Sequence, residues 1–80
     1  MEYIFIRLDT GISKQVDINL NRSVKDLRQE LLKQYHPELT LEEYKRILYL
    51  FFNAKILKDN FNLNYYGIQQ GSTIWEVRRG

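Results

Sequence analysis

The chain of 80 residues contains no cysteine, one proline and four glycines. Without cysteine it cannot form a disulfide, use a thiolate nucleophile or build the cysteine-based sites of most structural zinc domains. Small secreted domains usually depend on such cross-links, so this composition favours a cytoplasmic protein. The scarcity of proline and glycine, together with 44% hydrophobic and 28% charged residues, predicts a folded globular chain.

Long hydrophobic runs are also missing. None approaches the roughly 18 to 20 apolar residues that cross a bilayer, and the first segment alternates and carries charge, unlike a signal peptide. We therefore expect no membrane insertion. The length allows one domain, residues 1–80, which buries only about 60–65% of the surface of its unfolded chain and leaves no room for a separate catalytic lobe.

Neither sign of charge dominates the chain. Lysine and arginine together number 12 and the acidic residues 10, which gives a formal charge of +2. The longest runs of like charge are pairs, such as Arg78-Arg79. Nucleic-acid binding requires several cations on one face. The sequence therefore predicts no nucleic-acid partner.

The sequence offers no pattern for catalysis, a cofactor or a metal. Its single histidine, His36, stands beside Pro37 at a predicted helix end, where a capping or exposed role is expected. There is no nucleophile elbow and no glycine-rich phosphate loop, and the carboxylates lack metal-ligand spacing. We predict that the protein is not an enzyme.

Alternating apolar residues predict a β-hairpin in the first twenty residues. Ile4, Ile6 and Leu8 share one face of a strand, and residues 16–20 repeat the period of two. Gly11 lies between them and can take the left-handed conformation that short hairpins require.

A helix is predicted next. Ser23 is a good N-cap with Asp26 three residues later, and the helix should end near Tyr35, before Pro37. Its apolar stripe consists of Val24, Leu27, Leu31, Leu32 and Tyr35.

The second half is predicted to contain mainly strands and turns. Thr40 and Glu43 fit a second capping box, so we expect a short extra helix or turn up to about residue 46. A strand follows at 47–52, then a turn-rich excursion and a final strand at 73–77. One helix over one mixed sheet makes the fold class α+β.

This order of elements resembles ubiquitin over nearly the whole chain, as a pattern of spacing. Matching positions in the second half include Leu50, Phe52, Lys55, Leu57, Asp59, Leu63, Tyr66, Ile68, Gln69, Ser72, Thr73 and Ile74. The resemblance implies a β-grasp fold with four to five strands packed on one helix. It also implies structural roles for three residues, since Arg28 would pair with Asp59 and the Tyr66 hydroxyl would anchor the long loop.

Two departures from the ubiquitin pattern stand out. The connection between Tyr35 and Tyr49 is longer, and it contains the second capping box. Glu76 occupies a position that the family usually fills with a core aliphatic residue. We therefore expect the final strand to fray at Glu76 or to reach solvent early.

An excess of large apolar residues predicts a binding surface. If Leu50 and Ile74 point into the core, then Phe51, Trp75 and Val77 point to the open face of the sheet. By resemblance this is the patch that partner domains bind. Its loop member would be Leu8 or be replaced by Asp9, and its basic rim would consist of Lys55, Arg78 and Arg79. The alternative is that Trp75 folds over the sheet edge or packs on residues 39–44.

Three functions compete, and all of them act through protein partners. The first expectation is a stand-alone accessory protein, as either a monomer or a weak homodimer, because the length and the near absence of a tail resemble the YukD/EsaB-type ubiquitin-like proteins of bacterial type VII secretion. The second is a modifier conjugated through Gly80, although such modifiers end in a flexible Gly-Gly tail and this chain has one terminal glycine. The third is a ubiquitin-like domain of a larger protein.

Overall fold

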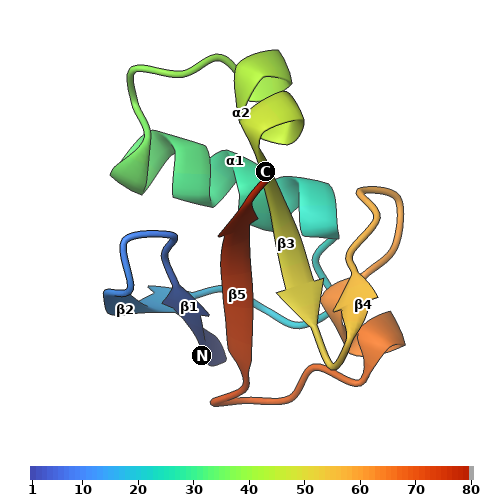
Figure 1. Ribbon diagram of the computed structural model, residues 1–80. Helices are drawn as coiled ribbons and strands as arrows, with labels where there is room; N and C mark the ends of the chain where they lie inside the picture. Colours follow the sequence, from blue (N-terminus) through green and yellow to red (C-terminus); the bar gives the residue numbers. More distant parts are fainter. Residues whose placement is uncertain (80) are drawn as a thin grey trace.

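Five strands form one mixed sheet in the order β2-β1-β5-β3-β4, and helix α1 crosses one face of it (Figure 1). The computed structural model describes residues 1–79, so the proposed conjugation site Gly80 lies outside the described residues. The elements are β1 (Tyr3–Arg7), β2 (Ser13–Asp17), α1 (Val24–Tyr35), α2 (Leu41–Ile47), β3 (Leu48–Phe52), β4 (Lys55–Ile56), the 3₁₀ turn η1 (Leu63–Tyr66) and β5 (Thr73–Arg78). The predicted α+β, β-grasp architecture is confirmed.

The first two strands form the predicted hairpin. Ile4 pairs with Val16 across an antiparallel ladder, and Gly11 takes a φ of 93° in the connecting turn. The second strand begins earlier than expected, at Ser13, whereas Ile18 and Leu20 follow it outside the ladder and are still buried. Their burial explains why the sequence pattern extended the strand to residue 20.

Both predicted capping boxes are present. The Ser23 hydroxyl accepts a hydrogen bond from the Asp26 backbone N–H at 3.0 Å, and Asp26 accepts one in return from the Ser23 N–H at 3.4 Å. Thr40 and Glu43 make the same exchange at the start of α2, at 3.1 and 2.9 Å. Local hydrogen bonding of this kind satisfies backbone donors that a helix start would otherwise leave unpaired.

Helix α2 is the feature that enlarges the core. It lies beside α1, at the end of the sheet where β5 ends and β3 begins (Figure 1), and its Tyr44 side chain is fully buried. Strand β3 begins directly at Leu48, whose backbone is extended, so the ambiguous apolar run divides into a helix up to Ile47 and a strand after it. No helix within residues 1–79 has the length and apolar character needed to cross a membrane.

Three side chains hold the long loop before η1 in place. The Arg28 guanidinium, buried on α1, lies 2.9 Å from the Asp59 carboxylate, and Lys45 reaches the same carboxylate at 3.3 Å. The Tyr66 hydroxyl accepts a hydrogen bond from the Lys58 backbone N–H at 2.9 Å. The partly buried ion pair orients α1 relative to the loop.

Candidate protein-binding surface

A row of paired residues crosses the face of the sheet that α1 does not cover. Phe51 on β3 lies opposite Trp75 on β5 and opposite Ile56 on β4, and Trp75 is in register with Arg7 on β1. Their neighbours Ile6 on β1, Leu50 on β3 and Ile74 on β5 are fully buried in the core. Since successive strand residues point to opposite faces, the row faces outward.

Trp75 is the most exposed aromatic residue of this row. Its side chain is 47% exposed, and the Arg7 guanidinium lies 4.8 Å from the ring centroid. Tyr44 of α2 contacts Glu76, which points to the opposite face of β5 from Trp75. The tryptophan therefore lies on the open face and not against residues 39–44.

The open face of the sheet carries more aromatic residues than the sequence analysis predicted. Tyr3 and Phe5 on β1 pack edge to face with ring centroids 5.7 Å apart, and Tyr49 on β3 lies opposite Val77. The Arg79 guanidinium lies 4.8 Å from the centroid of the Tyr49 ring. Alternation along β1 could have revealed the first pair, because Ile4 and Ile6 point inward and their neighbours must point outward.

We call six of these side chains the open-face patch. They are Phe5, Tyr49, Phe51, Ile56, Trp75 and Val77. Arg7 and Arg79 lie over aromatic rings of this face and provide its positive charge. Such a contiguous outward-facing cluster is typical of protein-binding surfaces.

Three residues predicted for this surface lie at its edges. Leu8 is partly buried and packs against the core, and it also lines a hollow together with Trp75 and Val77. Lys55 is exposed on the two-residue edge strand β4, where it lines a separate hollow with Ile56 and Tyr65. Arg78 lines the same hollow as Trp75 and Val77, and its guanidinium donates hydrogen bonds to the Asp9 carboxylate at 2.9 and 3.1 Å.

Glu76 lies on the buried side of β5, and the expectation that the strand frays there is wrong. The strand continues to Arg78, and Glu76 is 3% exposed. Its carboxylate accepts a hydrogen bond from the Tyr44 hydroxyl at 2.6 Å. Both carboxylate oxygens also lie 3.0 Å from Nε2 of His36. The longer connection therefore supplies the polar partners that this buried charge requires.

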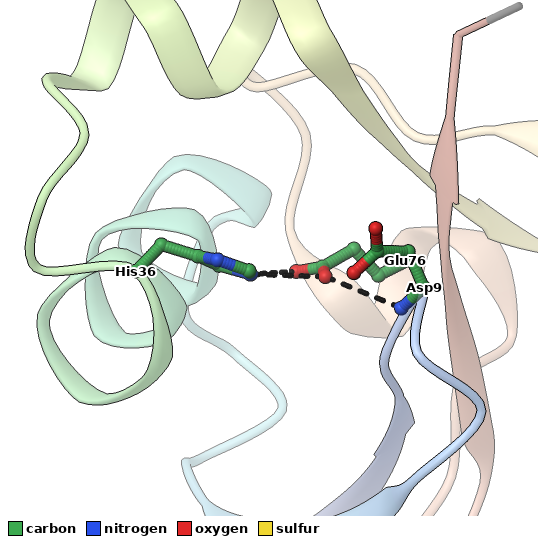
Figure 2. A group of neighbouring side chains, drawn as sticks. All are labelled: Asp9, His36 and Glu76. Atoms are coloured by element: carbon green, nitrogen blue, oxygen red, sulfur yellow. Dashed lines mark hydrogen bonds and ion pairs between the residues drawn. The ribbon is translucent and has the colours of Figure 1, made fainter.

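His36 takes the predicted capping position, but its side chain is not exposed. It caps the end of α1, but its side chain is 14% exposed and points at Glu76 (Figure 2), so it is not a surface residue. The Asp9 backbone N–H approaches the same carboxylate from the other side, at 3.5 Å (Figure 2). Three segments that are distant in the sequence thus meet at one buried carboxylate.

The side chains of Asp9, His36 and Glu76 offer ligand atoms within 4.8 Å of one another, a grouping that could hold a metal ion. In this structure protein groups use those atoms, because Tyr44 and His36 bind the Glu76 oxygens and Arg78 binds the Asp9 carboxylate. We therefore interpret the cluster as a structural network that fastens β5 to α1 and α2.

Tyr44 should resist ionisation while the protein is folded. Its burial, and then its hydrogen bond to the negative Glu76, raise the pKa of the phenol far above its ordinary value. Because the folded-state pKa is raised, this stabilisation is complete below about pH 10 and is lost as the pH rises further, by about 1.4 kcal/mol per pH unit. The measurement is the free energy of urea unfolding between about pH 8 and 11.

A Tyr44→Phe variant is the control for this pH dependence, because it cannot ionise at position 44. Subtracting its profile from that of the wild type removes the contribution of the other tyrosines and of the lysines. Parallel profiles above pH 10 would contradict the prediction. The phenol absorbance should also show one tyrosine that ionises only when the protein unfolds.

Comparison with known proteins identifies a family and similar solved structures. A model of the ubiquitin family matches residues 4–79. Among solved structures, the chain is similar to the UBL domain of Plasmodium falciparum Dsk2, with a TM-score of 0.79 and 27% sequence identity. That similarity covers 98% of this chain and 97% of the other. No curated protein sequence matches the chain.

Proposed function

The chain belongs to the ubiquitin family, and on that premise we propose that it acts without catalysis, by binding a protein partner through the open-face patch. The observation that carries the proposal is the outward row of Trp75, Phe51 and Ile56. A contiguous apolar patch of large side chains on a soluble protein is typical of a protein-binding site.

The energetics of the patch favour a protein partner. A tryptophan carries about 150–250 Å² of surface, and covering the exposed half of Trp75 would contribute about 2–3 kcal/mol before the costs of association. Arg7 adds a cation above the ring, and aromatic and arginine side chains are the commonest binding hot spots. The surrounding residues of the patch would exclude water from this centre.

Affinity capture with the immobilised protein tests the proposal. Phe51→Glu places a charge at the centre of the patch and should abolish capture of any specific partner. Gln29→Glu makes the same change of charge on the exposed side of α1, in the layer that covers the other face, and should capture as the wild type does. Equal capture by both variants would refute binding through the patch.

A narrower proposal is that the protein is a stand-alone accessory component of the YukD/EsaB type, in the cytoplasm, acting as a monomer or weak homodimer. The long connection that contains α2 supports this assignment. Identification of the captured protein by mass spectrometry tests it, since a component of a type VII secretion system is expected. Analytical ultracentrifugation checks the oligomeric state.

The similarity to the UBL domain of Dsk2 supports an alternative, in which the chain acts as a ubiquitin-like domain or as a modifier. The same captures would then yield components of a ubiquitin-type pathway. Incubation with an activating enzyme and ATP separates the two forms of this alternative. A thioester adduct at Gly80 would establish the modifier, and its absence would exclude conjugation by that enzyme.

A further inference from the structure

A second surface lies on the segment between β4 and η1, next to the open-face patch. Three aromatic rings gather there, and Phe61 and Tyr65 stack with centroids 4.3 Å apart and planes 17° from parallel. Tyr66 stands edge-on to both, at 6.0 and 5.2 Å. Two lysines and an isoleucine complete a shallow hollow, which we call the aromatic hollow: Lys55, Ile56, Lys58, Phe61, Tyr65 and Tyr66.

Folding does not account for the position of Tyr65. Leu63 fills the core beneath this segment, and the Tyr66 hydroxyl fixes the loop through the Lys58 backbone. Tyr65 is 65% exposed, and stacking on Phe61 holds its ring in place with a large part of its surface in water. A ring that is already ordered loses little conformational entropy when a ligand covers it.

The charge of the hollow is positive and unbalanced. Its lining contains two lysines and no carboxylate. Asp59, the nearest acidic residue in the sequence, directs its carboxylate to Arg28 at 2.9 Å and to Lys45 at 3.3 Å, on the side of the helices. Among the ion pairs of residues 1–79, none involves Lys55 or Lys58. Both ammonium groups are therefore available to an anionic partner.

We propose that the aromatic hollow binds an acidic peptide segment that carries an aromatic side chain. The peptide's ring would lie against Tyr65 and Ile56, and its carboxylates would pair with Lys55 and Lys58. This surface is distinct from the open-face patch, although Ile56 lies on the boundary between them. A partner that covers both would gain affinity through the linked contacts.

A titration of the ¹⁵N-labelled protein with three blocked pentapeptides tests the proposal by NMR. The first probe has four acidic residues around one tryptophan, the second replaces that tryptophan with alanine, and the third replaces the acidic residues with lysine. The first should shift the amide signals around Lys58 and Tyr65 at millimolar or lower concentration. The other two should bind at least tenfold more weakly.

Two variants place the binding at the hollow. Tyr65→Ala and Lys58→Glu change exposed side chains and should each weaken the first probe at least tenfold while the spectrum stays that of a folded protein. Trp75→Ala, which alters the open-face patch, should leave the affinity unchanged. If Trp75→Ala weakens the probe and Tyr65→Ala does not, the peptide binds the patch and the proposal is wrong.

Single-stranded RNA is the competing ligand class, because bases also stack on aromatic rings beside lysines. A short uridine oligonucleotide that binds the hollow more tightly than the acidic peptide would overturn the assignment to peptides. Shifts of equal size with the lysine-containing probe would also overturn it, since the lysines would then play no part. Neither result would affect the proposed role of the open-face patch.

Discussion

Trp75→Ala should weaken binding of the captured partner by about 30-fold to 1000-fold while the thermal midpoint stays close to that of the wild type. A central aromatic hot spot contributes about 2–4 kcal/mol to binding, which corresponds to that range in Kd. The tryptophan is already half in water, so its removal costs the folded state little. Isothermal titration calorimetry and differential scanning calorimetry provide the two measurements.

Tyr65→Ala is the matched control, because it removes another exposed aromatic ring from a different surface. Its affinity for a partner that binds only the patch should equal that of the wild type. Wild-type affinity in Trp75→Ala would show that the patch is not the binding surface. A large loss of thermal stability in Trp75→Ala would show instead that the tryptophan belongs to the core.

Glu76→Ala should lower the free energy of unfolding by about 3–5 kcal/mol. The substitution leaves the buried Tyr44 hydroxyl and the His36 ring without their acceptor and opens a cavity between β5 and α2. A domain of this size has roughly 4–12 kcal/mol of stability, and each kcal/mol corresponds to roughly 4–8 °C in Tm. Urea and thermal unfolding should therefore both show a severe loss.

An apolar replacement separates the hydrogen-bond network from simple packing. Glu76→Leu combined with Tyr44→Phe removes the buried carboxylate and its principal donor together, and should recover most of the lost stability. Glu42→Ala, on the exposed side of α2, should change the stability by no more than about 0.5 kcal/mol. If Glu76→Ala unfolds at the same urea concentration as Glu42→Ala, the network does not stabilise the fold.

The sequence predicted the elements whose causes are local. A capping box is formed within four consecutive residues, so Ser23 with Asp26 and Thr40 with Glu43 already located the starts of both helices. The hairpin likewise followed from alternation and a turn glycine. Alternation along a strand is also a local rule, so the outward position of Trp75 could be inferred from its buried neighbour Ile74.

The environment of Glu76 could not be predicted, because its partners come from far away in the chain. His36 and Tyr44 precede it by 40 and 32 residues, and their meeting depends on how α2 lies over the sheet. Position 76 therefore looked like a charge without a partner. A buried polar network becomes visible only when three-dimensional packing is known.

The orientation of residues at the edge of the sheet could not be predicted for a different reason. Strand β4 is only two residues long, so a shift of one position decides whether Lys55 or Ile56 joins the open face. The aromatic hollow was not predicted, because Phe61 and Tyr65 lie in a segment whose sequence shows neither strand nor helix periodicity. Their stacking results from the fold of the loop.

The parallel pairing of β1 with β5 has a consequence for synthesis on the ribosome. Strand β5 lies between β1 and β3, so the first strand finds its central neighbour only after residues 73–78 have been made. Until then the nascent hairpin and β3 have no strand between them, and the apolar residues that line the core stay uncovered. Chains that pair distant segments fold slowly and are exposed to aggregation in the interval. Folding of this domain is therefore completed only after β5 has emerged from the exit tunnel.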